Sequence, residues 1–149
     1  MSISGYKIVD ILVVEDNSGD ALLIKEVLKS SKIYNSLNIV KDGAEAMDFL
    51  HRKGKFTDVP HPDLILLDLN LPKLDGREVL AEIKSDDKLK HIPVVIMTTS
   101  QEEEDIIKSY QLHANCYVTK PINLDQFIKV IESIEDFWFS LVKLPGKVE

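Results

Sequence analysis

Cysteine is almost absent from this chain: Cys116 is the single one among 149 residues, so no internal disulfide can form. The first residues show no charged segment followed by a long apolar stretch, which a secretory signal would need. Apolar runs stay well short of the roughly 20 residues of a membrane-spanning helix. We therefore expect a protein of the cytoplasm that does not enter a membrane.

Basic residues are also in deficit. Lys and Arg total 18 against 25 Asp and Glu, which leaves a formal net charge of -7. A surface that binds nucleic-acid phosphates or anionic lipids is normally basic. We therefore expect neither DNA nor a membrane among the partners, and a cationic partner or a metal ion instead.

Two phosphate-binding loops and a zinc site are missing as well. The chain has no Gly-x-x-x-x-Gly-Lys-Ser/Thr loop for a nucleotide and no Gly-x-Gly-x-x-Gly loop for a dinucleotide. The four histidines are scattered, which argues against zinc. His113 and Cys116 are close in sequence, yet a cysteine that opens a strand is usually a small core residue.

The most apolar segment is DLILLDLNLP, residues 63–72. Its apolar residues do not alternate with polar ones, which is typical of a strand buried on both faces of a parallel sheet. Asp68 ends this strand, and a carboxylate there needs a cation, hydrogen-bond donors or an opening to water. The alternative interpretation is that Asp68 only caps the next turn.

Strand and helix patterns alternate along the whole chain. The predicted strands are residues 7–14, 36–40, 63–68, 94–97 and 116–119, and the predicted helices are residues 21 to about 30, 44 to near 54, around 79–83, around 106–112 and 124 to about 142. This order predicts an α/β fold, a doubly wound parallel sheet of five strands with right-handed crossovers. At 44% hydrophobic, 149 residues suffice for one domain and are too few for two.

Polar side chains follow four of these strands. Glu15 and Asp16 end the first, Asp68 the third, Thr98 the fourth and Lys120 the fifth. The carboxyl ends of parallel strands share one edge, so we expect these residues to converge there. Two carboxylates about 4 Å apart repel by about 4 kcal/mol at an effective dielectric constant near 20. A hard cation such as Mg²⁺, which prefers oxygen ligands, would offset this repulsion.

This set of groups suits phosphoryl transfer. Positive charge would stabilise the equatorial oxygens of the moving phosphoryl group while the Asp68 carboxylate attacks in line. In this combination the chain resembles the receiver domains of two-component response regulators, over about residues 7–135. The motifs that carry the resemblance are Glu15-Asp16, Asp68, Thr98 and Lys120-Pro121. The resemblance implies a flavodoxin-like (βα)5 receiver fold.

The resemblance also implies roles for single residues. Asp68 would accept phosphate from the phosphohistidine of a histidine kinase. Mg²⁺ would be held by Glu15, Asp16, Asp68 and the backbone carbonyl of Asn70. We expect a phosphoacceptor rather than an enzyme, with self-phosphorylation and autodephosphorylation only.

Three further residues would complete the response. By the same resemblance, Thr98 would hydrogen-bond the phosphoryl group, Lys120 would pair with it, and Tyr117 would change rotamer on activation. The signal would then leave through the face of the fourth helix, fifth strand and fifth helix. Each residue keeps an alternative: Thr98 as a helix cap, Lys120 as a solvated charge and Tyr117 as filler beside the fifth strand.

The last helix carries more apolar residues than one stripe needs. Ile128, Phe137, Phe139 and Val142 lie off the core stripe, which favours a partner surface, such as a homodimer interface, although the segment can also fold back on its own domain. This tail, with DLNLPKLDGREVL at 68–80 and LHANCY at 112–117, resembles small stand-alone regulators that partner phytochrome-type histidine kinases.

We therefore expect one receiver domain, residues 1–149, with a core at about 7–135 and an extension at about 136–149. Nothing after Leu144 is long enough for an output domain, so output is expected through protein contact or phosphate relay. Two other functions compete with this one. A Mg²⁺-dependent phosphatase would need an Asp where Asn70 stands, and the Glu15-Asp16 pair would repel the phosphate of a flavodoxin-like cofactor.

Overall fold

The computed structural model describes residues 8–30, 34–71, 75–99, 116–120 and 123–142. For residues 98–99, 116–117, 119–120 and 134–142 the description is of the backbone. The strands are Val9–Val14 (β1), Asn35–Val40 (β2), Leu64–Asp68 (β3), Val94–Thr99 (β4) and Cys116–Lys120 (β5). The α-helices are Ser18–Lys29 (α1), Gly43–Leu50 (α2), Gly76–Ser85 (α3) and Leu124–Val142 (α5), and Gly54–Phe56 (η1) is a 3-10 helix. The predicted helix around 106–112 lies outside the described residues.

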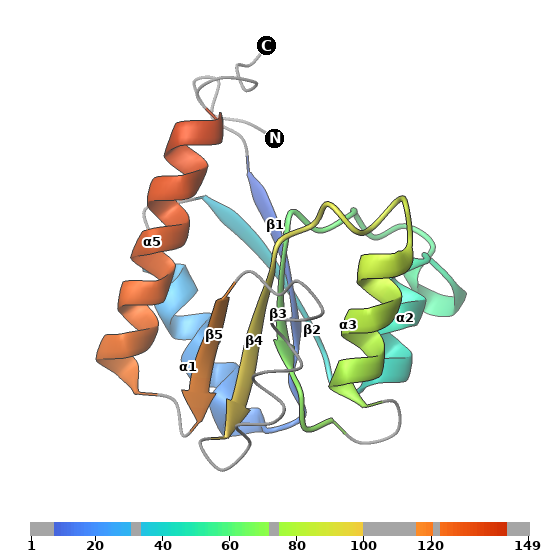
Figure 1. The fold of residues 1–149 in the computed structure, drawn as a ribbon, viewed down its shortest axis with the longest axis horizontal. Helices are drawn as coiled ribbons and strands as arrows, with labels where there is room; N and C mark the ends of the chain where they lie inside the picture. The colour runs from blue at the N-terminus through green and yellow to red at the C-terminus, as the bar shows by residue number, and fades with distance from the viewer. Residues whose placement is uncertain (1–7, 31–33, 72–74, 100–115, 121–122, 143–149) are drawn as a thin grey trace.

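The strands form one parallel sheet in the order β2-β1-β3-β4-β5. β1 and β3 are neighbours although α1, β2 and α2 separate them in the chain; their register pairs Leu12 with Ile65 and Val14 with Leu67. Every pair of neighbouring strands is parallel, so the carboxyl ends of the strands share one edge, at the bottom of Figure 1. The predicted five-stranded parallel α/β sheet is therefore confirmed.

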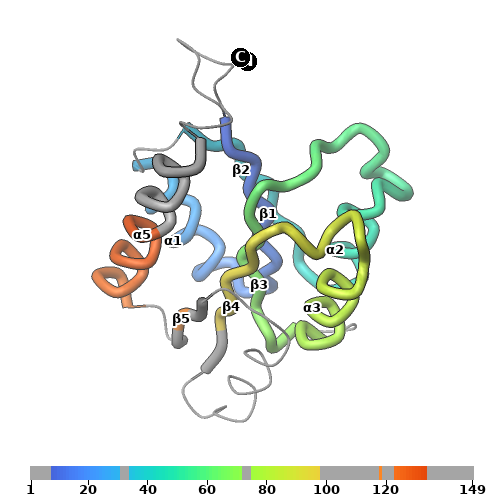
Figure 2. The backbone as a smooth tube through the Cα atoms, turned by 45° about the horizontal axis from the view of Figure 1, so that its top comes forward, coloured from blue at the N-terminus to red at the C-terminus, as the bar shows by residue number. Residues whose placement is uncertain are grey.

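Helices cover both faces of this sheet, which confirms the doubly wound arrangement. Figure 2 shows α1 and α5 on one side, and α2 and α3 on the other. Successive residues of β1 alternate between the two cores: Leu12 and Val14 belong to the cluster with α2 and α3, and Val13 to the cluster with α1 and α5. Each residue of β3 is buried. This double burial explains the unbroken apolar run that the strand shows in the sequence.

The helix N-termini are capped by side chains that the sequence supplies. The sequence predicts a capping box from Asp75 and Glu78, which are three residues apart, and the structure confirms it: the Asp75 side chain accepts from the backbone of α3, and Glu78 accepts from Asp75 N. The sequence also predicts Asn123 as the cap of the last helix, and this is confirmed because Asn123 Oδ1 accepts from Gln126 N at 3.0 Å. Of the described helices, none combines the length and the apolar character that crossing a membrane would require.

Several predicted boundaries differ from the observed ones by one to a few residues, and the end of the second helix differs most. The second helix ends at Leu50 and not near Gly54, because the chain turns away through the left-handed region, with φ of 55° at Arg52 and 61° at Gly54. The segment Gly54–Phe56 then forms a 3-10 helix, which the sequence pattern did not predict. The first strand begins at Val9, whereas residue 7 lies outside the described part.

Candidate functional site

Three carboxylates meet at the carboxyl edge of the two central strands. Glu15 and Asp16 follow β1 directly, and Asp68 is the last residue of β3. One oxygen of each lies within 4.8 Å of the others. Glu15 and Asp68 are each 1% exposed, whereas Asp16 is exposed. The structure thus brings together the three acidic residues whose convergence the sequence predicted.

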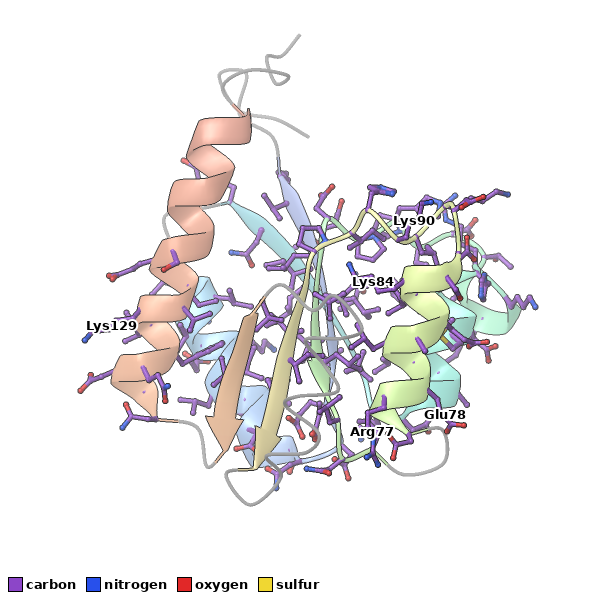
Figure 3. The ribbon with its side chains drawn as sticks, in the orientation of Figure 1. Arg77, Glu78, Lys84, Lys90 and Lys129 are labelled. Carbon is purple, nitrogen blue, oxygen red and sulfur yellow. The ribbon has the colours of Figure 1, made fainter. Side chains whose placement is uncertain are left out.

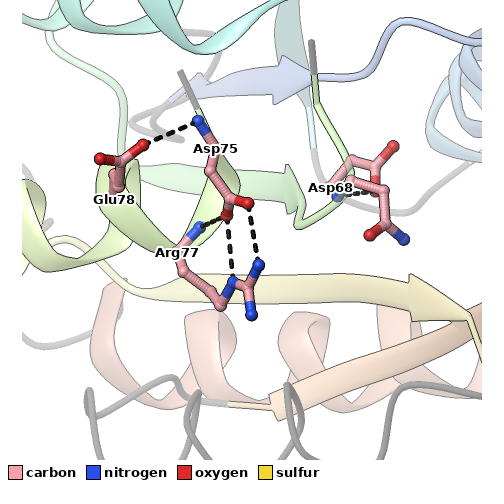
Figure 4. Close-up of polar contacts among 5 residues, drawn as sticks. Asp68, Asp75, Arg77 and Glu78 are labelled. Atoms are coloured by element: carbon pink, nitrogen blue, oxygen red, sulfur yellow. Dashed lines mark hydrogen bonds and ion pairs between the residues drawn. The ribbon is translucent and has the colours of Figure 1, made fainter. Parts of the chain in front are cut away.

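Backbone amides orient the two buried carboxylates. Asn17 N donates to Glu15 Oε2 at 3.0 Å, and Asn70 N donates to Asp68 Oδ1 at 2.9 Å (Figure 4). Each carboxylate therefore organises the turn that follows its own strand. Asp68 does cap the turn that follows it, as the alternative interpretation held. A capping role alone does not explain why two further carboxylates lie beside it.

The donor set of this cluster fits a hard divalent cation. Buried carboxylates at this spacing repel one another, and burial makes the repulsion stronger than it would be in water. Oxygens that share one ion at 2.0–2.6 Å lie at most about 4–5 Å apart, so a spacing within 4.8 Å suits a single ion. Oxygen-only ligands of this kind favour Mg²⁺, Mn²⁺ or Ca²⁺ over zinc.

The other predicted site residues lie on β4 and β5. Asp68 of β3 pairs with Met97 of β4, and Thr98 is the next residue of β4 after Met97. On β5, Tyr117 pairs with Ile96, and Lys120, the last residue of the strand, pairs with Thr99. The backbone therefore carries Thr98 and Lys120 to the edge that holds the carboxylates. Their side chains and that of Tyr117 lie outside the description, so their roles stay predictions.

The N-terminus of α3 is a further part of this edge. Arg77 lies at the lower end of the helix in Figure 3, while Lys84 and Lys90 lie at its upper end. The Arg77 guanidinium donates through Nη2 to Asp75 Oδ2 at 2.9 Å and through Nε to Asp75 Oδ1 at 3.1 Å (Figure 4). These bonds lower the pKa of the Asp75 carboxyl below 3.8. Sequence reasoning found the Asp75 cap but missed Arg77, because an Asp-x-Arg spacing alone does not indicate an ion pair.

Residues 11–132 match the family described as the response regulator receiver domain. The chain belongs to this family. The chain is 56% identical over 136 residues to the response regulator Rcp1 of a Synechocystis species, a match that covers 91% of this chain and 92% of Rcp1. The resemblance drawn from the strand-end residues is therefore confirmed.

Two solved structures of receiver proteins are similar throughout. The phosphorylated cyanobacterial phytochrome response regulator RcpA is 52% identical with a TM-score of 0.80, and the match covers 91% of this chain and 96% of RcpA. The Mn²⁺-bound form of Rcp1 is 55% identical with a TM-score of 0.78, over 87% of this chain and 94% of that one. The narrower resemblance to phytochrome-associated regulators is thus confirmed, and one of these relatives, Rcp1, has been solved with Mn²⁺ bound.

Proposed function

We propose that this receiver domain accepts a phosphoryl group on Asp68 from a histidine kinase, with Mg²⁺ bound beside it. The observation that carries the proposal is the nearly complete burial of Asp68 next to Glu15 and Asp16, at the edge where parallel α/β sheets bind ligands. An apolar side chain would pack better at this buried position than a carboxylate does, so packing does not explain why Asp68 is there.

The ligands of Mg²⁺ would be the carboxylates of Glu15, Asp16 and Asp68 and the backbone carbonyl of Asn70. When bound, the ion would supply positive charge against the carboxylates and the phosphoryl oxygens. The Asn70 N–H holds the Asp68 carboxylate in place. An Asp68 oxygen would then form the new bond to phosphorus, while the bond from phosphorus to the donor imidazole breaks and its electron pair stays on nitrogen.

Two more side chains would serve the transferred group. Thr98 would donate a hydrogen bond to a phosphoryl oxygen, and Lys120 would pair with its negative charge. Tyr117 would move with them and alter the face formed by the fourth helix, β5 and α5. The backbone positions of Thr98 and Lys120 at the carboxyl edge support this proposal.

The proposed partner is a sensor histidine kinase of the phytochrome type. RcpA is a phytochrome response regulator, and 52% identity over most of both chains supports the same kind of partner here. Kinase and regulator would meet in the cytoplasm. The whole chain would form one receiver domain with an extended last helix, and it would act as a phosphoacceptor rather than as an enzyme with turnover.

The test is phosphorylation by acetyl phosphate with Mg²⁺, followed by intact mass. We expect one phosphoryl adduct on the wild type and none on Asp68→Asn, which removes the nucleophile but little packing. Asp63→Asn is the matched control, because Asp63 precedes the same strand at its opposite end, where it accepts from Asp10 N. This control should be labelled like the wild type.

Three outcomes would overturn the proposal. They are normal labelling of Asp68→Asn, no labelling of the wild type by either acetyl phosphate or a kinase, and rapid turnover of many small phosphoesters. The last would favour the phosphatase instead, although Asn70 stands where that enzyme would need an acid.

A further inference from the structure

Gly76, the first residue of α3, lies against the backbone that carries Asp68. A Cβ placed on Gly76 would lie 2.5 Å from Leu69 Cα and 3.0 Å from Leu69 C, and closer still to the carbonyl oxygen of Asp68. These are backbone atoms, which cannot swing aside as the end of a side chain can. The glycine is therefore required by space; a left-handed backbone is not the reason, since among the described glycines only Gly54 has a positive φ.

The same backbone is held from its other side. Leu69 N donates to Met97 O on β4 at 2.9 Å, and Leu69 O accepts from Gly76 N at 3.2 Å. The peptide after Asp68 is thus held between the sheet and the first turn of α3.

The helix cannot easily retreat from this contact. Val79, Leu80 and Ile83 of α3 are fully buried against the sheet, and close-packed cores resist such shifts. A side chain at position 76 would therefore push on the segment from Asp68 to Asn70, which carries two of the proposed metal ligands.

We propose that Gly76 is a positioning residue for the metal site: its missing side chain sets where Asp68 and the Asn70 carbonyl stand relative to Glu15 and Asp16. The inference rests on the proposed function, because it concerns the same metal. Mg²⁺ demands near-ideal octahedral geometry at 2.0–2.1 Å, whereas Ca²⁺ accepts 2.3–2.6 Å and irregular shells. Displaced ligands should therefore harm Mg²⁺ binding more than Ca²⁺ binding.

The experiment is calorimetric titration of the whole chain with Mg²⁺ and, separately, with Ca²⁺. For Gly76→Ala we expect Mg²⁺ affinity to fall by about 10- to 100-fold, as for other changes that misplace metal ligands from outside the ligand set. Ca²⁺ affinity should fall clearly less, so the ratio of the two dissociation constants changes. A merely structural role would lower the melting temperature and leave this ratio unchanged.

Gly54→Ala is the matched control. Its Cβ would meet no atom within 4 Å, but the φ of 61° strains any other residue there. The strain should lower the melting temperature without any change in either metal affinity.

A second variant keeps the inference testable if Gly76→Ala does not fold. Asp75→Ala removes the N-cap that accepts from Arg77 N at 2.8 Å, so it loosens the turn from which Gly76 N reaches Leu69 O. It should shift the Mg²⁺ to Ca²⁺ ratio in the same direction by a smaller factor. An unchanged ratio in the folded variants would overturn the role of Gly76, whereas a wild type that binds no Mg²⁺ would overturn the proposed function itself.

Discussion

Glu15 and Asp68 are nearly inaccessible to water, while Asp16 beside them is exposed. Truncating the exposed Asp16 side chain leaves no cavity, so Asp16 affects the stability of the fold mainly through its charge. Without a cation that charge opposes folding, because it is held near two other negative groups. With a cation bound, the same charge favours the native state, since only the folded chain assembles the cluster.

We therefore expect Asp16→Ala to weaken Mg²⁺ binding and to raise the melting temperature in metal-free buffer. For a chain of this size, each kcal/mol of repulsion removed is worth roughly 2–4 °C. Thermal unfolding with a chelator and with excess Mg²⁺ measures both effects. Asp48→Ala on the exposed side of α2 is the control and should change neither. A lower melting temperature of Asp16→Ala in the chelator would contradict the repulsion.

Single residues also mark how far the sequence alone could reach at this site. Glu15, Asp16 and Asp68 could be predicted, because each ends an apolar strand and parallel strands share an edge. The proposed positioning role of Gly76 could not be predicted, because the sequence Asp75-Gly76 indicates only the start of a helix. Only the approach of Leu69 to position 76 shows why a side chain is excluded there.

Helix α3 depends on its first turn, where Asp75 caps the backbone and pairs with Arg77. The Arg77 guanidinium lowers the pKa of Asp75 below 3.8 in the folded state. A depressed pKa means that the unfolded chain binds more protons, so stability rises with pH across this range. The contribution is complete above the ordinary pKa of 3.8 and is lost as the pH falls through the lower, folded value.

We expect the wild type and Asp75→Asn to converge in stability on acidification. Asparagine can still cap the helix but cannot form the ion pair. Urea unfolding of both proteins, from neutral pH to below 3.8, gives the difference between their free energies of unfolding. That difference should be largest near neutral pH and should shrink in acid. If it stays constant throughout, the pair does not stabilise the helix.

At the scale of elements, periodicity predicted each described strand and α-helix, whereas it missed the short 3-10 helix η1 and several boundaries. The second helix was predicted to end near Gly54 because glycine often ends helices. The helix instead ends at Leu50, and the chain then turns away at Arg52, a residue type that gives no sign of a positive φ. Whether such a residue adopts a positive φ depends on how the chain packs after the helix, and the periodicity of the sequence carries no information on that packing.

The molecule as a whole presents β2 at one edge of the sheet and β5 at the other. The predicted signalling face includes β5 and α5, and the predicted apolar surface at Phe137 and Phe139 lies on α5, outside the described side chains. Phosphorylation adds about -1.5 to -2 charges. The two new bonds to charged groups would contribute roughly 1.5–3 kcal/mol each. Only their largest combined contribution reaches the roughly 5.5 kcal/mol that a shift from 1:99 to 99:1 requires. Part of the Lys120 interaction would already exist before phosphorylation, so the shift should be partial.

We therefore expect a dimer that is detectable before phosphorylation and stronger afterwards. Sedimentation velocity with and without beryllofluoride measures the change, and Phe139→Asp should weaken the dimer in both states. Ile39→Asp is the matched control, because Ile39 is 38% exposed on β2, at the far edge of the sheet. A monomer at every concentration in both states would rule the dimer out.

The chain enters the sheet at Val9 and leaves α5 at Val142, both at the end of the molecule opposite the carboxylates (Figure 1). This follows from the parallel sheet, in which β1 runs toward the acidic edge and α5 runs back from it. A fluorescent protein fused to either terminus, or a sensor surface that captures one, would therefore leave the acidic edge facing solution. Binding of the proposed kinase can accordingly be followed on a tethered protein without the tether covering the proposed phosphoacceptor, Asp68.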